Sequence, residues 1–183
     1  MSSALKWGLI TGMVLIVQSL LSTVLGVGTD PNASPVLGFA ISALGIVVTF
    51  FTIYLGIKEI RDNEMNGYIT VGGALKVGLK IALIAGILAA VYTIIYAKFI
   101  DPHMMDKIMA AAEQKWEENN MKEEQMEMAR KMMSIFKNPF LIAGMVILST
   151  CFWGLIQSLI AGAMLKKEAP PTIPMDTPSV PSV

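Results

Sequence analysis

The chain alternates between long apolar stretches and short polar connections. Four stretches are long and apolar enough to cross a bilayer, and we expect spans at about residues 7–28, 36–57, 79–100 and 140–165. A helix needs about 20 mainly apolar residues to span the ~30 Å hydrocarbon core. These stretches are continuously apolar, and a lone strand would leave backbone groups unpaired in lipid, so all four are predicted as helices. The first exceeds the ~7–15 apolar residues of a signal peptide, so we expect it to be retained.

The segment of about residues 103–137 has a different pattern, because apolar residues recur at helical spacing among many charged ones. The apolar positions are Met105, Ile108, Met109, Ala112 and Trp116, followed by Met121, Met128, Met132 and Ile135. This pattern predicts two amphipathic helices that are separated near Asn119 and Asn120. Either they fold back as a hairpin that stands off the membrane, or they lie along the membrane surface with the apolar stripe among the headgroups.

These elements define the expected architecture. We predict an all-α integral membrane protein with four transmembrane helices and an amphipathic helical excursion between the third and the fourth. The membrane domain would cover residues 1–168. Residues 169–183 contain five of the nine prolines and are predicted to be disordered.

Composition supports a membrane protein and excludes several other classes. Residues of the apolar set make up 54% of the chain and charged residues 15%, against about 25% charged residues in soluble domains. The net charge is zero, and the mean hydropathy is +0.61. The chain therefore has no basic footprint for nucleic acid, and its single cysteine, Cys151, excludes a disulfide framework. The expected partner is the lipid bilayer, and a homo-oligomer or a membrane-protein partner stays open.

Basic residues near the spans predict the orientation. The first connection has no Lys or Arg, whereas the second has a collar of Lys58, Arg61, Lys76 and Lys80. Because basic residues mark the cytoplasmic side, both termini are predicted there, in an inner (plasma) membrane. The third connection has seven basic residues, interleaved with eight acidic ones, and argues the other way. The collar is either a topology marker or a dock for anionic headgroups or a protein.

A few polar and small residues within the spans are candidates for contacts between helices. Gln18 and Gln157 lie near the middle of the first and fourth spans, and Ser158 follows Gln157. The glutamines could bond each other or line a polar path, because a polar group in hydrocarbon needs a partner. Small residues recur every four positions from Gly8, Ala82 and Gly154, which favours close helix packing within the chain or a homodimer face.

The sequence offers little for catalysis or for cofactor binding. The only histidine is His103, and Cys151 lies in an apolar run. Eight of the 14 methionines lie between Met104 and Met133, where thioether sulfur beside His103 would suit Cu(I). Their amphipathic spacing favours helix contacts instead. We therefore expect no catalytic residues, no cofactor and no metal.

Two functions remain. The first is a non-enzymatic inner-membrane protein whose extracytoplasmic helices contact a partner or the membrane surface. The alternative is a small channel or transporter subunit, lined by Gln18, Gln157 and hydroxyl groups of Thr23, Thr49 and Ser158. The absence of ionisable residues deep in the spans argues against a coupled transporter.

Several short motifs resemble those of one bacterial membrane-protein family. They are YLGIKEIRD at 54–62, GYITVGGALKVGL at 67–79, YAKFIDP at 96–102, Asn138-Pro139 and GLIQSLI at 154–160. In order and spacing they resemble the family called domain of unknown function 4199, over roughly residues 5–167. Val71 stands where the family tends to have an aromatic residue. The resemblance implies four membrane helices and no established activity.

Overall fold

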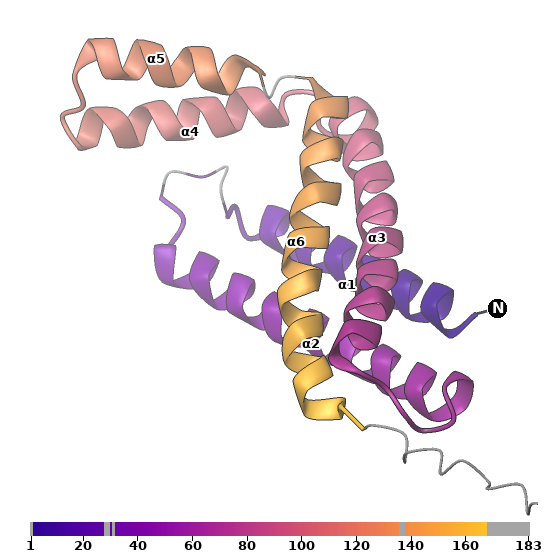
Figure 1. Cartoon of the computed structure of the whole chain (residues 1–183). Helices are drawn as coiled ribbons and strands as arrows, with labels where there is room; N and C mark the ends of the chain where they lie inside the picture. The colour runs from indigo at the N-terminus through magenta and orange to yellow at the C-terminus, as the bar shows by residue number, and fades with distance from the viewer. Residues whose placement is uncertain (1, 28–29, 31, 136–137, 168–183) are drawn as a thin grey trace, which may run out of the picture.

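The structure is a computed structural model that describes residues 2–27, 30, 32–135 and 138–167. In this part of the chain four long apolar helices form the body of the molecule (Figure 1). They are α1 (Ser3–Val24), α2 (Pro35–Glu64), α3 (Val71–Ile95) and α6 (Pro139–Leu165). All four are long and apolar enough to cross a membrane, and α3 continues through the π-helix η1 (Tyr96–Ile100). The predicted all-α membrane fold is confirmed. The predicted disordered tail, residues 169–183, lies outside the described residues.

Helix ends follow local chemistry, and two helices extend beyond the predicted spans. The helix α2 continues through the charged run to Glu64, and α3 begins at Val71 rather than near residue 79. Thr70 caps α3, because its hydroxyl accepts a hydrogen bond from the Gly73 amide at 3.1 Å. Asn138 caps α6 by accepting from the Phe140 amide at 3.0 Å, and Pro139 follows it at the first helical position.

Short polar contacts show which helix ends lie together. The amide of Ser3, at the start of α1, donates to Glu64 at the end of α2, at 3.3 Å. Ile69, just before α3, forms an antiparallel bridge with Lys167, just after α6. The start of α1, the end of α2, the start of α3 and the end of α6 therefore share one end of the bundle, which we call the basal end. The opposite end is called the hairpin end.

Small residues bring α3 and α6 into close contact. A Cβ added to Gly154 would overlap the Cβ of Ala82, and one added to Gly162 would lie 2.8 Å from the Cβ of Ala74. The start of α1 packs on α3 in the same way, because Gly8 faces Ile84. These small-residue faces are therefore occupied within the chain, which is the first of the two interpretations of the pattern.

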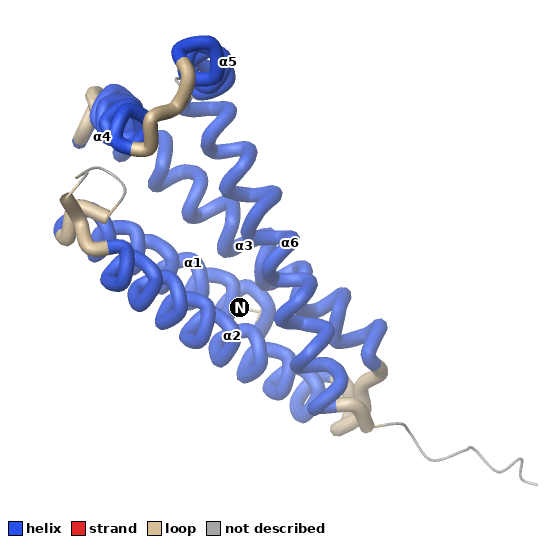
Figure 2. Tube along the Cα trace, turned by 90° about the vertical axis from the view of Figure 1, so that its left-hand side faces the viewer, coloured by secondary structure: helices blue, strands red, loops and turns tan. Residues whose placement is uncertain are grey.

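Packing is densest towards the basal end. A core cluster of buried residues, including Ile57, Ile81 and Ala161, joins α2, α3 and α6 there. Along α1 the buried positions stop at Gly12, although the helix continues to Val24. Figure 2 shows the pair α1 and α2 beside the pair α3 and α6, with the two pairs separating towards the hairpin end.

The excursion between α3 and α6 is an antiparallel hairpin. It consists of α4 (Met104–Glu118) and α5 (Glu123–Ser134), which lie side by side and run across the direction of α3 and α6 (Figures 1 and 2). The break falls where the sequence placed it, because Asn120 has a φ of 52°, a left-handed conformation that asparagine tolerates better than most residues.

Candidate functional site

Gln157 anchors α6 to α2 in the middle of the bundle. Its Nε2 donates to the Thr49 hydroxyl at 3.1 Å and to the Ile46 carbonyl at 3.4 Å. The Thr49 hydroxyl in turn donates to the Gly45 carbonyl at 2.8 Å. Because a carbonyl can only accept, these partners place the amide nitrogen, and not the oxygen, against α2.

Gln18 approaches the same part of α2 from α1. Its Nε2 donates to the Ile41 carbonyl at 3.5 Å, and its amide lies so close to Gly45 that an added Cβ would overlap it. The sequence left open a direct bond between Gln18 and Gln157. The structure shows instead that the hydrogen bonds of both side chains go to α2.

The two glutamines line one cavity of about 180 Å³ between the four long helices. None of the side chains that line this cavity is ionisable, and its polar groups are neutral amides and hydroxyls. The polar residues of the lining are Thr11, Gln18, Thr49, Ser149, Thr150 and Gln157. Leu15, Ile46, Ile53 and Trp153 supply apolar walls. The site is therefore suited to hydrogen bonding of uncharged molecules rather than to acid–base chemistry.

Two hydroxyls that the sequence placed in such a lining lie elsewhere. Ser158 is fully buried, bonds the Gly154 carbonyl and packs against Gly78 of α3. Thr23 donates to the Ser19 carbonyl within α1 at 3.0 Å. Ser158 therefore serves the close contact between α3 and α6, and neither hydroxyl belongs to the cavity.

The four basic residues of the collar do not act alike. Arg61 closes the basal end, because its Nη1 donates to the Leu165 carbonyl at the end of α6, at 3.2 Å, and its Nε pairs with Asp62 at 2.7 Å. The other three, Lys58, Lys76 and Lys80, are exposed. Arg61 therefore has a structural contact that its position in a charged run did not reveal.

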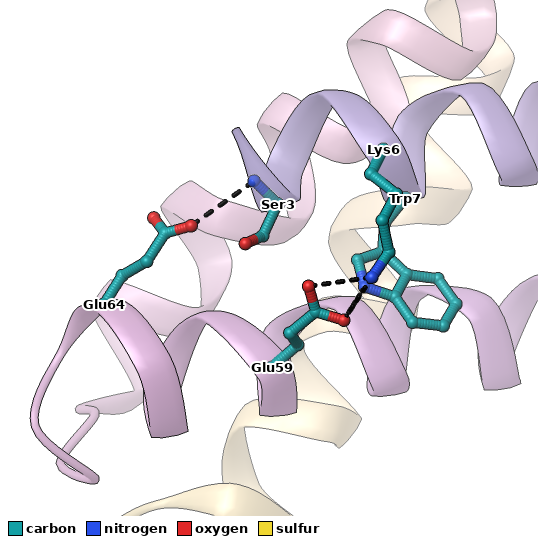
Figure 3. Close-up of polar contacts among 5 residues, drawn as sticks. All are labelled: Ser3, Lys6, Trp7, Glu59 and Glu64. Carbon is teal, nitrogen blue, oxygen red and sulfur yellow. Dashed lines mark hydrogen bonds and ion pairs between the residues drawn. The ribbon is translucent and has the colours of Figure 1, made fainter. Parts of the chain in front are cut away.

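Sequence reasoning missed a polar cluster around Glu59 at the basal end (Figure 3). The Glu59 carboxylate accepts from the Lys6 ammonium at 2.7 Å and from the Trp7 indole nitrogen at 2.9 Å. The Lys6 ammonium also lies 5.3 Å from the centre of the Trp7 ring. The available signal was an acidic residue at the end of an otherwise uncharged span.

An ion pair joins the two helices of the hairpin. The Arg130 guanidinium of α5 donates to Glu113 of α4 at 2.8 Å and to Glu123 at 3.1 Å. Hydrogen bonds from Arg130 to these two carboxylates raise its pKa above the ordinary value. Met126 is the buried apolar residue of α5.

The apolar stripe predicted for the second amphipathic helix does not pack against the first. Met128 and Met132 are each 63% exposed, and Ile135 is 60% exposed. At 100° per residue these positions point away from Met126 and Arg130, which face α4. The stripe of Met128, Met132 and Ile135, called the outer stripe below, is therefore free in the described chain.

The candidate metal and catalytic groups lie apart from the cavity. The side chain of His103 is 81% exposed and lies 3.6 Å from Asp106, while Asp101 pairs with Lys107 at 2.7 Å. Cys151 is partly buried in α6, and it is not among the residues that line the cavity.

Comparison with known proteins adds a family and no activity. No curated protein and no solved structure matches the chain. One family model, described as a protein of unknown function (DUF4199), matches residues 6–167. This match covers the helical body and the hairpin, so the chain belongs to the DUF4199 family.

Proposed function

We propose that this protein is a non-enzymatic inner-membrane protein whose hairpin of α4 and α5 contacts the membrane surface on the extracytoplasmic side. The observation that carries the proposal is the outer stripe of Met128, Met132 and Ile135, three large apolar side chains exposed on a charged helix. Exposed apolar residues at helical spacing are typical of helices that lie in the interface.

The place of the hairpin favours lipid over a protein partner. Phe99 and Ile100, at the end of η1, are 79% and 60% exposed, as expected of residues at the edge of the hydrocarbon. The Lys98 ammonium lies 4.6 Å from the centre of the Phe140 ring, an arrangement suited to a cation beside the headgroups. Only residues 101–103 separate η1 from α4, so the hairpin begins at this boundary. Its axes run across those of α3 and α6 (Figure 1).

The proposed orientation follows from the basic residues at the basal end of the bundle. The collar and the basic residues Lys166 and Lys167 belong to the basal end, which supports a cytoplasmic position for it and for both termini. Cysteines placed at Asn66 and at Asn120, in a Cys151→Ala background, should therefore react with a membrane-impermeant maleimide from opposite sides. Asn120→Cys should react in intact cells, and Asn66→Cys only after lysis. Reaction of Asn66→Cys in intact cells would reverse the orientation.

A fluorescent label can test the contact with lipid. Met128→Cys, in the same background, would carry an environment-sensitive dye in nanodiscs, and lipids with a nitroxide near the headgroup would quench it. The matched control is Glu127→Cys, an exposed position on the charged side of α5. We expect strong quenching at residue 128 and little at residue 127. Equal, weak quenching at both positions would refute contact with lipid and would indicate that the outer stripe binds a protein partner instead.

The neutral lining of the cavity supports the non-enzymatic part of the proposal, because none of its side chains can exchange a proton near neutral pH. The same cavity favours a second candidate, a small channel or transporter subunit. Solute flux in liposomes that is lost in Gln157→Leu would support this candidate. Equal flux in liposomes with and without the protein would exclude it for the solutes tested.

A further inference from the structure

The cavity between the four long helices contains two hydrogen-bond acceptors, the side-chain oxygens of Gln18 and Gln157. Gln157 uses its Nε2 on Thr49 and Ile46, and Gln18 uses its Nε2 on Ile41. Among the described residues no donor reaches the side-chain oxygen of either glutamine. Neither oxygen is a fully enclosed atom, because the buried side-chain polar atom without a partner in the described chain is the Tyr92 hydroxyl. Both oxygens can therefore accept a hydrogen bond from an occupant of the cavity, and in a low-dielectric interior such a bond would stabilise that occupant.

A second cavity extends the first along the bundle. It has a volume of about 340 Å³ and shares Leu15, Gln18 and Thr150 with the first cavity. Its polar lining is made of hydroxyl groups from α1, α3 and α6, which are those of Ser19, Ser22, Tyr92, Thr93 and Thr150. Ser19 and Ser22 lie later in α1 than Gln18, so this second cavity lies towards the hairpin end.

The other end of the bundle is closed. Ile53, which lines the first cavity, begins the core cluster that continues through Ile57 and Ile81 towards the basal end. Ile57 and Ile81 are completely buried, and Arg61 bonds the end of α6 beyond them. The space between the middle of the bundle and the hairpin end is therefore lined by polar groups, whereas packed isoleucines fill the space between the middle and the basal end.

We propose that the first cavity is a binding site for a small, uncharged molecule that donates hydrogen bonds, such as an alcohol, a polyol or an amide, and that this molecule enters from the hairpin end. The two free amide oxygens supply the acceptors, and Trp153 and Ile53 supply an apolar wall. The absence of ionisable side chains from the lining disfavours a charged ligand, because a charge is costly at membrane depth. The volume of about 180 Å³ far exceeds the ~10–15 Å³ that one water needs, so the site has room for a small molecule of this kind. This proposal goes beyond the proposed function, since it does not depend on what the hairpin contacts.

Access can be measured by the reactivity of single cysteines in full-length protein lacking Cys151. Thr150→Cys lies in the lining of both cavities, and Leu148→Cys, on the same helix, is the control because its side chain is 64% exposed towards lipid. A maleimide reacts with the thiolate, which forms only where water reaches it. In sealed vesicles we expect Thr150→Cys to react at least tenfold faster than Leu148→Cys. A membrane-impermeant reagent should prevent this labelling of Thr150→Cys only when it is added on the side of the membrane from which Asn120→Cys can also be labelled. Ser149→Cys is a second reporter if Thr150→Cys does not fold.

Ligand class can be tested with glycerol as the probe, against betaine, which has no hydrogen-bond donor, at the same osmolality. Glycerol should slow the labelling of Thr150→Cys at least threefold. It should not slow the labelling of Asn120→Cys, and the protection should disappear in Gln157→Met. If Thr150→Cys reacts as slowly as Leu148→Cys, acyl chains fill the cavity and the proposal is overturned. If the impermeant reagent blocks Thr150→Cys when it is added on the basal side, entry from the hairpin end is overturned. If betaine protects Thr150→Cys as well as glycerol does, the proposed class of ligand is overturned.

Discussion

The Lys6 ammonium at the start of α1 lies 2.7 Å from the Glu59 carboxylate near the end of α2. Lys6 lies near the first residue of α1 and Glu59 near the last residue of α2. Because the two helices are antiparallel, these positions meet at the basal end, where the ion pair joins α1 to α2. The same carboxylate also accepts the Trp7 indole, so one acidic residue contacts two successive side chains of α1.

Reversing this ion pair should lower stability in a recoverable way. Lys6→Glu and Glu59→Lys each place two like charges in contact, so each should lower the melting temperature of the purified protein in detergent. The double variant restores the attraction and should recover much of the loss, although the Trp7 contact with the carboxylate is not rebuilt. A double variant less stable than both single ones would show that the pair does not couple the helices.

Close packing of α3 on α6 predicts a difference between two glycines of the same helix. In Gly154→Ala the new methyl group overlaps Ala82, and this overpacking should cost about 1–3 kcal/mol of unfolding free energy. Gly144→Ala is the control, since no atom lies within 4 Å of its added Cβ, and it should be neutral or slightly stabilising. Unfolding by titration with a denaturing detergent measures both. Equal effects would contradict the close contact.

Backbone conformation separates two other glycines, each with open space around an added Cβ. Gly67 has a φ of 81°, so Gly67→Ala should destabilise the protein by about 1–2 kcal/mol through backbone strain alone. Gly72 lies in the first turn of α3, where an alanine should stabilise the helix by up to ~1 kcal/mol. Opposite signs in thermal melts of the two variants are the expected result.

Hydrogen bonding by Gln157 should contribute measurably to the bundle. Gln157→Met keeps the length of the side chain and removes both bonds to α2, which should cost about 0.6 kcal/mol and at most ~2 kcal/mol. Gln125→Met, at an exposed position of α5, is the matched control and should change the unfolding free energy little. A stability unchanged at both positions would indicate that Gln157 is solvated rather than bonded.

Much of the architecture could be predicted from the chain because its signals are local. The continuous apolar stretches require helices in lipid, and Asn138 with Pro139 marks the start of α6. The position of the break between α4 and α5 follows from Asn120, because asparagine tolerates a left-handed backbone better than most residues. Each of these features depends on residues close together in sequence.

Contacts between distant residues could not be predicted in this way. The periodicity of α5 placed Met128, Met132 and Ile135 on one face, but an apolar stripe does not say which of two faces meets α4. The Arg130 ion pair with Glu113 and the burial of Met126 decide that orientation. Gln18 and Gln157 were expected to need partners, but their partners are carbonyl and hydroxyl groups of α2, and no sequence spacing encodes those.

The sequence by itself determined that most of the chain lies in lipid, that its spans are helical and that the hairpin breaks near Asn120, because hydrophobicity, backbone hydrogen bonding and local backbone conformation act over a few residues. Only the tertiary structure decided which helices touch, that Glu59 meets Lys6, and that the pairs separate to leave a polar cavity. The reason is that the packing of small residues such as Gly8 and Gly154 sets the angles between helices, and those angles depend on both partners at once.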